Sequence, residues 1–182
     1  MGIAAQGRGV SNHGAYLRGP LTALGLTAAL AVAVADQAVK LWLIFVFDLG
    51  ARGTVNVLPG VDLVLTWNTG ISYGWFQQEG PFGQGALLAL KVIAVALLWI
   101  WLARAGSRLT AIALGLIIGG ALGNAIDRLA YGAVADFVLL YLRTPAWSFN
   151  WYVFNLADVA IVAGVVGLLY ESLIGDRAAK AP

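Results

Sequence analysis

The sequence predicts an all-α integral membrane protein with four transmembrane helices and a small extracytoplasmic β-sheet between the first two helices. Hydrophobic residues make up 60% of the 182 residues and charged residues only 11%, whereas soluble domains carry about 25% charge. The mean hydropathy is +0.83. Four apolar runs separated by polar loops reach the ~17–25 residues that a helix needs to cross a bilayer.

We expect the four spans at residues 21–47, 87–103, 109–129 and 152–173. Together they form one domain over residues 20–174, between a disordered cytoplasmic tail at 1–19 and a second cytoplasmic tail at 175–182. The first run is much longer than the apolar core of a cleaved signal peptide, so we interpret it as a retained helix.

Glycines at four-residue intervals mark the third span, at Gly115, Gly119 and Gly123. Small residues at this spacing let two helix backbones approach closely. Generic helix packing is sufficient to explain the pattern. The same close approach would also bring the polar ends of the helices together.

The longest extramembrane loop, residues 48–83, contains the stretch VNVLPGVDLVLTWNTG. Apolar and polar residues alternate on both sides of Pro59-Gly60, which predicts two short strands joined by a turn. We expect a small sheet on the membrane surface, with Trp67, Trp75 and Phe76 at headgroup depth, where aromatic side chains are enriched.

Loop charges predict the orientation. With four spans, the termini and the short 104–108 turn share one side, which carries Arg8, Arg18, Arg104, Arg108, Arg177 and Lys180. The other side carries Arg52, Arg128 and Arg143 in longer loops. The positive-inside rule places the termini in the cytoplasm. The end of the third span and the start of the fourth then lie near the outer membrane surface.

Composition excludes several kinds of chemistry. There is no cysteine, and the single histidine, His13, lies in the polar N-terminal tail. Thiolate sites, histidine-based metal sites and a serine–histidine triad are therefore not expected, and we predict no cofactor and no metal. A net charge of +2 without a basic stripe predicts no nucleic-acid partner.

Ionisable residues in or beside apolar runs are the strongest functional signal, because a charge at the centre of a membrane helix costs at least ~2.5–3.5 kcal/mol. Asp36 and Lys40 are four residues apart in the first span, so they share a helix face and can neutralise each other. We interpret them as a structural pair. Asp127, Asp136 and Asp158 remain, close to the predicted outer surface.

Paired carboxylates can hydrolyse a peptide bond without histidine, cysteine or metal, because repulsion keeps one protonated while the other activates water. Asp158 lies at the start of a helix without a neighbouring cation. Its partner is either Asp127 or Asp136. The Asn-x-x-Asp pattern that Asp127 shares with Asp158 favours Asp127, whereas the adjacent Arg128 argues for a structural ion pair there. Spacing alone leaves the choice open.

Five short motifs follow one another along the chain: Asp36-Gln-x-x-Lys40, Asn68-x-Gly70, Gly123-Asn124-x-x-Asp127-Arg128, Gly132-x-Val134-x-Asp136-Phe137 and Phe154-Asn155-x-Ala157-Asp158. In this order they resemble a known family, the bacterial lipoprotein signal peptidases, also called signal peptidase II. One departure is Ile71-Ser72-Tyr73, where family members usually show Ala-Ala/Ser-Phe. The resemblance implies that Asp136 and Asp158 form the catalytic dyad. It implies supporting or substrate-binding roles for Asn68, Gly70, Asn124, Asp127, Arg128 and Asn155.

The implied activity is that of an aspartic endopeptidase of the bacterial inner membrane. It removes the signal peptide from diacylglyceryl-modified prolipoproteins by cutting on the amino side of the lipidated cysteine. Expected partners are this substrate and membrane lipids, and we expect a monomer. The alternative classes are a proton-coupled transporter and a non-enzymatic membrane scaffold. Lys91, in the second span, has no role that the sequence suggests.

Overall fold

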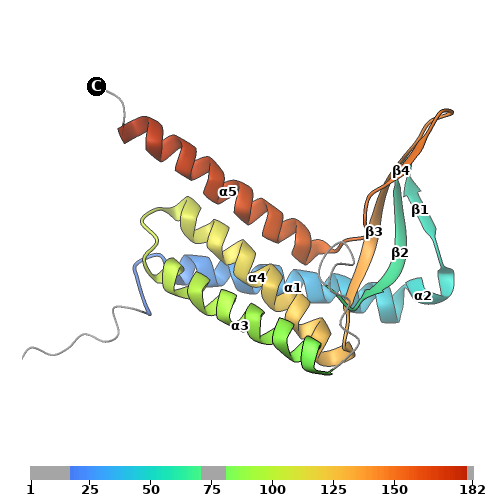
Figure 1. Ribbon diagram of the computed structural model, residues 1–182, viewed down its shortest axis with the longest axis horizontal. Helices are drawn as coiled ribbons and strands as arrows, with labels where there is room; N and C mark the ends of the chain where they lie inside the picture. The colour runs from blue at the N-terminus through green and yellow to red at the C-terminus, as the bar shows by residue number, and fades with distance from the viewer. Residues whose placement is uncertain (1–16, 71–80, 180–182) are drawn as a thin grey trace, which may run out of the picture.

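The computed structural model describes residues 17–70 and 81–179 of the chain, except for the side chains of residues 81–88, 91 and 174–179. A bundle of long helices carries a four-stranded antiparallel sheet at one end (Figure 1). The predictions for His13, Ile71-Ser72-Tyr73, Trp75, Phe76 and the Lys91 side chain fall outside this described part.

The long helices agree with the predicted apolar runs. They are α1 (Thr22–Leu41, continued by the π-helix η2, Trp42–Val46), α3 (Pro81–Ala103), α4 (Arg108–Tyr131) and α5 (Leu156–Ala179). Three helical segments of the described part are long and apolar enough to cross a membrane: Thr22–Val46, Arg108–Tyr131 and Leu156–Leu173. A shorter apolar segment, Val92–Ala103, lies in α3.

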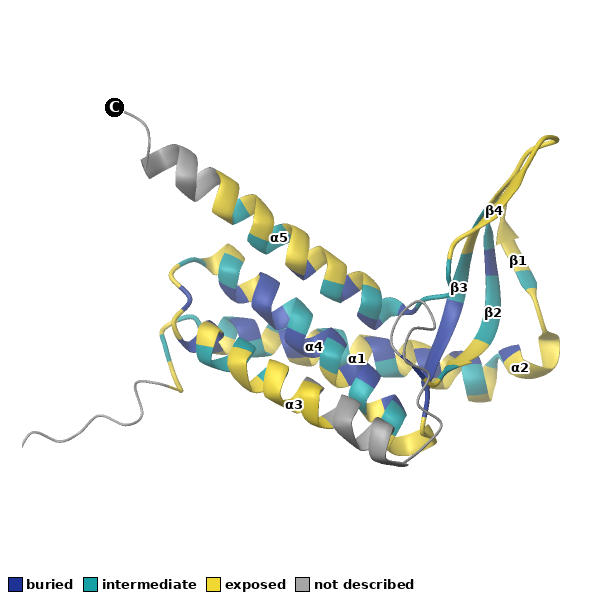
Figure 2. Cartoon of the chain, viewed as in Figure 1, coloured by how far each residue is buried: buried dark blue, intermediate teal, exposed yellow. Residues whose placement is uncertain are grey.

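Helix α4 is the centre of the bundle and contacts α1, α3 and α5. It contains a long series of buried residues, which Figure 2 shows in dark blue. Ser107 caps its first turn by accepting a hydrogen bond from the Thr110 amide at 3.0 Å. Gly132 ends it in the left-handed conformation, at φ 75°.

The glycine series of α4 faces α1, as its spacing predicted. A methyl group at Gly119 would lie only 2.9 Å from the Cα atom of Ala29 on α1. At Gly123 it would lie 2.6 Å from the Asp36 carboxylate. The absence of side chains on this face therefore allows the backbone contact along α1 and α4 and, at one end, admits the Asp36 carboxylate.

The predicted hairpin around Pro59-Gly60 is confirmed as β1 (Val55–Leu58) and β2 (Val61–Asn68), which follow the short helix α2 (Leu49–Arg52). The sheet predicted between the first two spans extends beyond that loop. Half of the sheet, β3 (Val134–Arg143) and β4 (Ser148–Asn150), comes from the segment between α4 and α5. The strand order is β1-β2-β3-β4, with Thr66 of β2 opposite Asp136 of β3.

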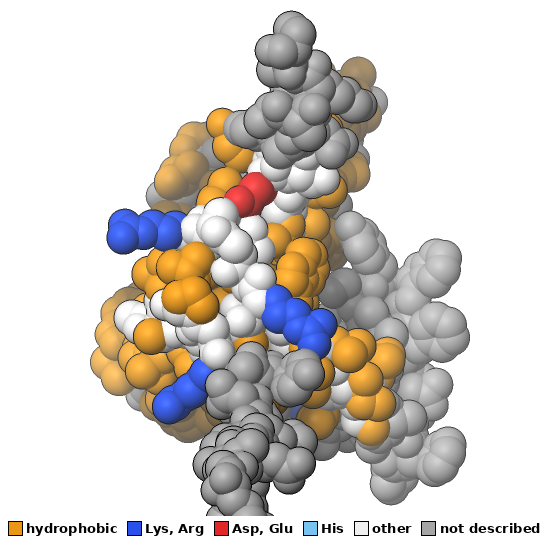
Figure 3. All heavy atoms as spheres, turned by 90° about the vertical axis from the view of Figure 1, so that its left-hand side faces the viewer, with side chains coloured by type: hydrophobic (Ala, Val, Ile, Leu, Met, Phe, Trp, Pro, Cys, Tyr) orange, Lys and Arg blue, Asp and Glu red, His pale blue; other side chains and the backbone are white. Residues whose placement is uncertain are grey.

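The bundle end opposite the sheet is marked by arginine. Arg18 precedes α1, and Arg104 and Arg108 flank the turn between α3 and α4. All three are exposed. Figure 3 shows this end, where basic side chains and an acidic one lie among hydrophobic and uncharged atoms.

Candidate active site

The bridge between β3 and the segment before α5 positions two of the predicted site residues. Phe154 accepts hydrogen bonds from the amides of Phe137 and Val138, at 3.0 and 2.8 Å, and its own amide donates to the Val138 carbonyl at 3.0 Å. Asp136 lies just before this bridge on β3, and Asp158 lies just after it in the first turn of α5. Residues 22 positions apart are thus held at the same end of the bundle.

Asn155 links the two carboxylates. Its side-chain Nδ2 donates to Asp136 Oδ1 at 2.6 Å, and its backbone amide donates to Asp158 Oδ2 at 3.1 Å. In return, the Asp158 amide donates to Asn155 Oδ1 at 3.0 Å. Asp136 and Asp158 therefore contact one common residue. By contrast, Asp127, which the sequence left as the other candidate, bonds to Lys40, Gln37 and the Ala135 amide.

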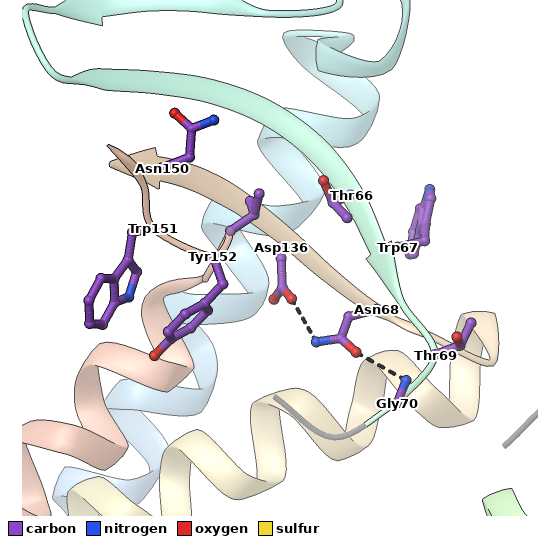
Figure 4. Close-up of a pocket in the computed structure, with 10 residues that line it drawn as sticks. Thr66, Trp67, Asn68, Thr69, Gly70, Asp136, Asn150, Trp151 and Tyr152 are labelled. Carbon is purple, nitrogen blue, oxygen red and sulfur yellow. Dashed lines mark hydrogen bonds between the residues drawn. The ribbon is translucent and has the colours of Figure 1, made fainter. Parts of the chain in front are cut away.

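Two more asparagines hold the remaining carboxylate oxygens. Asn68, at the end of β2, donates from Nδ2 to Asp136 Oδ2 at 3.0 Å, and its Oδ1 accepts from the Gly70 amide at 3.0 Å (Figure 4). Asn124, on α4, donates from Nδ2 to Asp158 Oδ1 at 3.0 Å. In the described part of the chain, every buried side-chain nitrogen and oxygen has a hydrogen-bond partner.

Asp136 opens onto a cavity of about 470 Å³ between β2 and the segment that precedes α5. Figure 4 shows its carboxylate pointing toward Asn68 and Gly70, with Tyr152 on the other side. Asp158 lines a second cavity, of about 360 Å³, with apolar walls that include Leu140, Phe154 and Val162. Trp151 and Tyr152 line both cavities. One carboxylate thus faces a polar recess and the other an apolar one.

Burial away from water raises the pKa of Asp136 to about 6. The hydrogen bond from Asn68 opposes this rise, and the negative charge of Asp158 adds to it. A carboxyl group with such a pKa holds a proton far more readily near neutral pH than an ordinary aspartate does. Asp136 therefore has the proton affinity that suits a general acid.

Asp127 is only 1% exposed and its contacts are internal. Its Oδ2 lies 2.7 Å from Lys40 Nζ and accepts the Ala135 amide at 3.0 Å, while its Oδ1 accepts from Gln37 at 2.8 Å. The sequence suggested an ion pair with the adjacent Arg128. The partner is instead a lysine from another helix, because successive helical residues point away from each other.

The predicted pair of Asp36 and Lys40 is confirmed, with 2.8 Å between Asp36 Oδ2 and Lys40 Nζ. Arg128 donates to the Gly70 carbonyl at 2.9 Å and to the Asn124 carbonyl at 3.3 Å. Gln37 lies inside the Asp-Gln-x-x-Lys motif, but no role for it was predicted from the sequence. The amides of Ala135 and Ala157 were not predicted either, because no side-chain pattern reveals a backbone donor.

No group of three or more histidine, aspartate or glutamate side chains within residues 17–70 and 81–179 has the arrangement of a metal site. The side chains around Asp136 and Asp158 bring together amides, from Asn68, Asn124 and Asn155, and the Arg128 guanidinium.

Comparison with known proteins decides the family. The model of the family described as signal peptidase (SPase) II matches residues 28–174. The chain belongs to the signal peptidase II family. It is 64% identical to the lipoprotein signal peptidase of Nitrobacter hamburgensis over 87% of this chain and 96% of that protein. It is 60% identical to that of Rhodopseudomonas palustris, over 87% and 97% of the two chains.

The fold also has a counterpart among solved structures. A solved structure described as a bacterial membrane enzyme superposes with a TM-score of 0.66 at 24% identity, covering 87% of this chain and 92% of that one. At this identity the likeness concerns the fold alone. The chain thus shares its sequence with the signal peptidase II family and its arrangement of helices and sheet with a bacterial membrane enzyme.

Proposed function

We propose that the protein is an aspartic endopeptidase that removes the signal peptide from diacylglyceryl-modified prolipoproteins, cutting on the amino side of the lipidated cysteine. The observation that carries the proposal is the connection of Asp136 and Asp158 through Asn155, in a chain of the signal peptidase II family. Nothing in the comparisons favours the alternative of a proton-coupled transporter.

The chemistry assigns one proton to the pair. We assign the proton to Asp136, because burial raises its pKa to about 6, and the role of base to Asp158. Asp158 takes a proton from a water molecule, whose oxygen attacks the scissile carbonyl carbon. Asp136 gives its proton to the leaving nitrogen, the C–N bond breaks, and the products are a carboxylate-ended signal peptide and a free amine on the lipidated cysteine.

The two cavities suggest how the substrate lies. The peptide around the scissile bond occupies the polar cavity beside Asp136, where Asn68 and the Arg128 fork bind backbone groups. An acyl chain of the substrate occupies the apolar cavity along α5, beside Asp158. Their shared wall of Trp151 and Tyr152 supports this division, because it places the lipidated residue at the junction of the two cavities.

The membrane arrangement that fits this reaction has four spans, with α3 as the second, and both termini in the cytoplasm. The exposed arginines at the bundle end in Figure 3 support this orientation by the positive-inside rule. The carboxylates then lie near the outer face of the bacterial inner membrane, where water reaches them. The protein acts as a monomer with lipids as neighbours.

One face of the β3–β4 hairpin lies on the outer membrane surface. Leu142 pairs with Phe149 of β4, and Trp147 and Trp151 flank that strand at two-residue spacing, so these side chains share a face. Each is between 43% and 54% exposed. Aromatic side chains prefer the membrane interface, and this face continues into the apolar cavity through Trp151.

The decisive test uses purified protein in detergent with a lipidated substrate and a gel-shift readout. Asp136→Asn and Asp158→Asn are expected to abolish cleavage while the protein still inserts and folds, and Asp127→Asn to leave measurable activity. Activity without an ion gradient separates a peptidase from a transporter or a scaffold. Turnover of Asp136→Asn at the wild-type rate would remove the proposed dyad.

A further inference from the structure

A buried ammonium group lies at the centre of the hydrogen-bond network behind the site. Lys40 on α1 is 2% exposed. Its Nζ lies 2.8 Å from Asp36 Oδ2, 2.7 Å from Asp127 Oδ2 and 3.1 Å from Asn124 Oδ1. An ammonium has three N–H donors, and each therefore has an acceptor. We call these four residues the Lys40 cluster.

Each acceptor in the cluster also bonds to a segment that carries one of the two site aspartates. Asp36 Oδ1 accepts the Ala157 amide at 3.0 Å, and Ala157 directly precedes Asp158. Asp127 Oδ2 accepts the Ala135 amide at 3.0 Å, and Ala135 directly precedes Asp136. The two anchors are equivalent: one carboxylate, one backbone amide, one residue before the aspartate.

Asn124, the third acceptor of Lys40, connects it to Asp158 through side-chain hydrogen bonds. Its Oδ1 accepts from Lys40, and it also accepts from Asn155 Nδ2 at 3.0 Å. Its Nδ2 donates to Asp158 Oδ1. Lys40 thus connects, through one residue in each case, to the backbone before Asp136, the backbone before Asp158 and the Asp158 carboxylate itself.

Stability alone is a weak reason for such a cluster. Replacing a buried ion pair by apolar residues of similar volume is often neutral or stabilising, because desolvation of the charges cancels their attraction. A cluster that contains two carboxylates and one cation, at 0–2% exposure, is a costly way to hold helices together. The symmetry of its outward contacts points to a geometric role.

We propose that Lys40, held by Asp36 and Asp127, is a positioning residue that sets the separation and orientation of both catalytic carboxylates at once. The inference rests on the proposed function, because it assigns to the cluster a role in that reaction. Lys40 touches neither catalytic carboxylate. It acts through the amides of Ala135 and Ala157 and through Asn124.

The cluster also has an electrostatic effect on the dyad. The charged groups whose fields reach Asp136 are Asp158 on α5, Lys40 on α1 and Arg128 on α4. The positive charge of Lys40 favours the ionised form of Asp136 and lowers its pKa against the larger effect of burial. Removal of this charge therefore moves the pH dependence of cleavage to higher pH.

The test is a kinetic comparison of wild type, Lys40→Met and Thr110→Val with the lipidated substrate, well below the unfolding midpoint of each protein. Thr110 bonds to Glu171 between α4 and α5 at the opposite end of the bundle, so it is the matched control. We expect Lys40→Met to lose about 10²-fold in kcat, the scale of a ~1 Å misplacement of reacting groups. KM should change little and the pH profile should shift to higher pH. Thr110→Val should lower only the unfolding midpoint.

A folded Lys40→Met protein with wild-type kcat and pH profile would overturn the inference and leave the proposed function intact. A wild-type protein that does not cleave the substrate would overturn both. If Lys40→Met does not fold, the isosteric variants Asp36→Asn and Asp127→Asn decide. Both should lower kcat, and the double variant should depart from the product of the single losses, because both act through Lys40. Wild-type kcat in both single variants, or a loss in the double variant equal to the product of the single losses, would refute the positioning role of Lys40.

Discussion

The contact between Gly123 and Asp36 offers a way to disturb the candidate site from within the helix packing. A methyl group at Gly123 would lie 2.6 Å from Asp36 Oδ2 and 3.2 Å from its Cγ. The carboxylate must therefore retreat by about 0.8 Å to reach ordinary van der Waals contact. Asp36 can retreat only by lengthening its 2.8 Å pairing with Lys40 or its 3.0 Å bond to the Ala157 amide.

Gly123→Ala should therefore cost more activity than stability. Overpacking costs about 1–3 kcal/mol, and the gain in helix propensity from glycine to alanine returns up to about 1 kcal/mol. The Asp36 carboxylate accepts the Ala157 amide, directly before Asp158. Its displacement by nearly 1 Å predicts a kcat loss between about 10-fold and 10²-fold. The assay is gel-shift cleavage of the lipidated substrate, paired with the thermal unfolding midpoint of each protein in detergent.

Two other glycines supply the controls. At Gly119 a methyl group meets backbone atoms of Ala29, which cannot rotate away, so Gly119→Ala should lose more stability and less activity than Gly123→Ala. At Gly106 nothing lies within 4 Å, so Gly106→Ala should match wild type in both. Equal kcat for Gly123→Ala and wild type would refute the claim that the position of Asp36 matters for the reaction.

Three further predictions concern the dyad, its asparagine link and the hairpin. The kcat of cleavage should fall as pH rises above about 6, because Asp136 then loses the proton that it donates. A rate that stays level well above that pH would contradict the assignment of Asp136 as the acid. Asn155→Ala should lower kcat by about 10²-fold, since a buried amide side chain that contacts the site is lost. Asn56→Ala, at the far side of the sheet, should leave kcat unchanged. Equal rates for the two variants would argue against Asn155 as the connection between Asp136 and Asp158. The chain has no cysteine, so a polarity-sensitive fluorophore can be attached to a single introduced cysteine. In vesicles, the fluorophore on Phe149→Cys should report an apolar environment, and the fluorophore on Ser148→Cys should report water. Identical spectra for the two variants would place the hairpin away from the lipid.

The parts of the fold that depend on local pattern were predictable from the sequence. Apolar runs gave α1, α4 and α5 within a few residues, and the alternation around Pro59-Gly60 gave β1 and β2. The pairing of β2 with β3 was not predictable, because it joins residues such as Thr66 and Asp136 that are far apart in the chain. Nothing in either segment specifies its partner, since a strand pattern defines a face and not a neighbour.

In the candidate site, too, local patterns were predictable from the sequence and long-range contacts were not. The motifs placed Asp136, Asp158 and their asparagines in one region, and the helix spacing gave the pair of Asp36 and Lys40. The second ion pair of Lys40, with Asp127, was missed because the sequence places Arg128 beside Asp127. Which cation reaches a carboxylate inside a bundle depends on how the helices pack. Here the glycine face of α4, which allows α1 to come close, determines it.

The two aspartates come from different kinds of element, a strand and a helix, and their surroundings differ accordingly. Asp158, in the first turn of a helix, benefits from the unpaired amides and positive dipole that favour a negative charge there, even though it borders an apolar cavity. Asp136 lies on a strand with no such dipole, and burial raises its pKa to about 6. A carboxyl group with a raised pKa suits the role of proton donor, which the proposed reaction assigns to Asp136. The sheet is therefore more than a cover over the helices. It places the second acid close to α5 without giving it the electrostatic environment of a helix end.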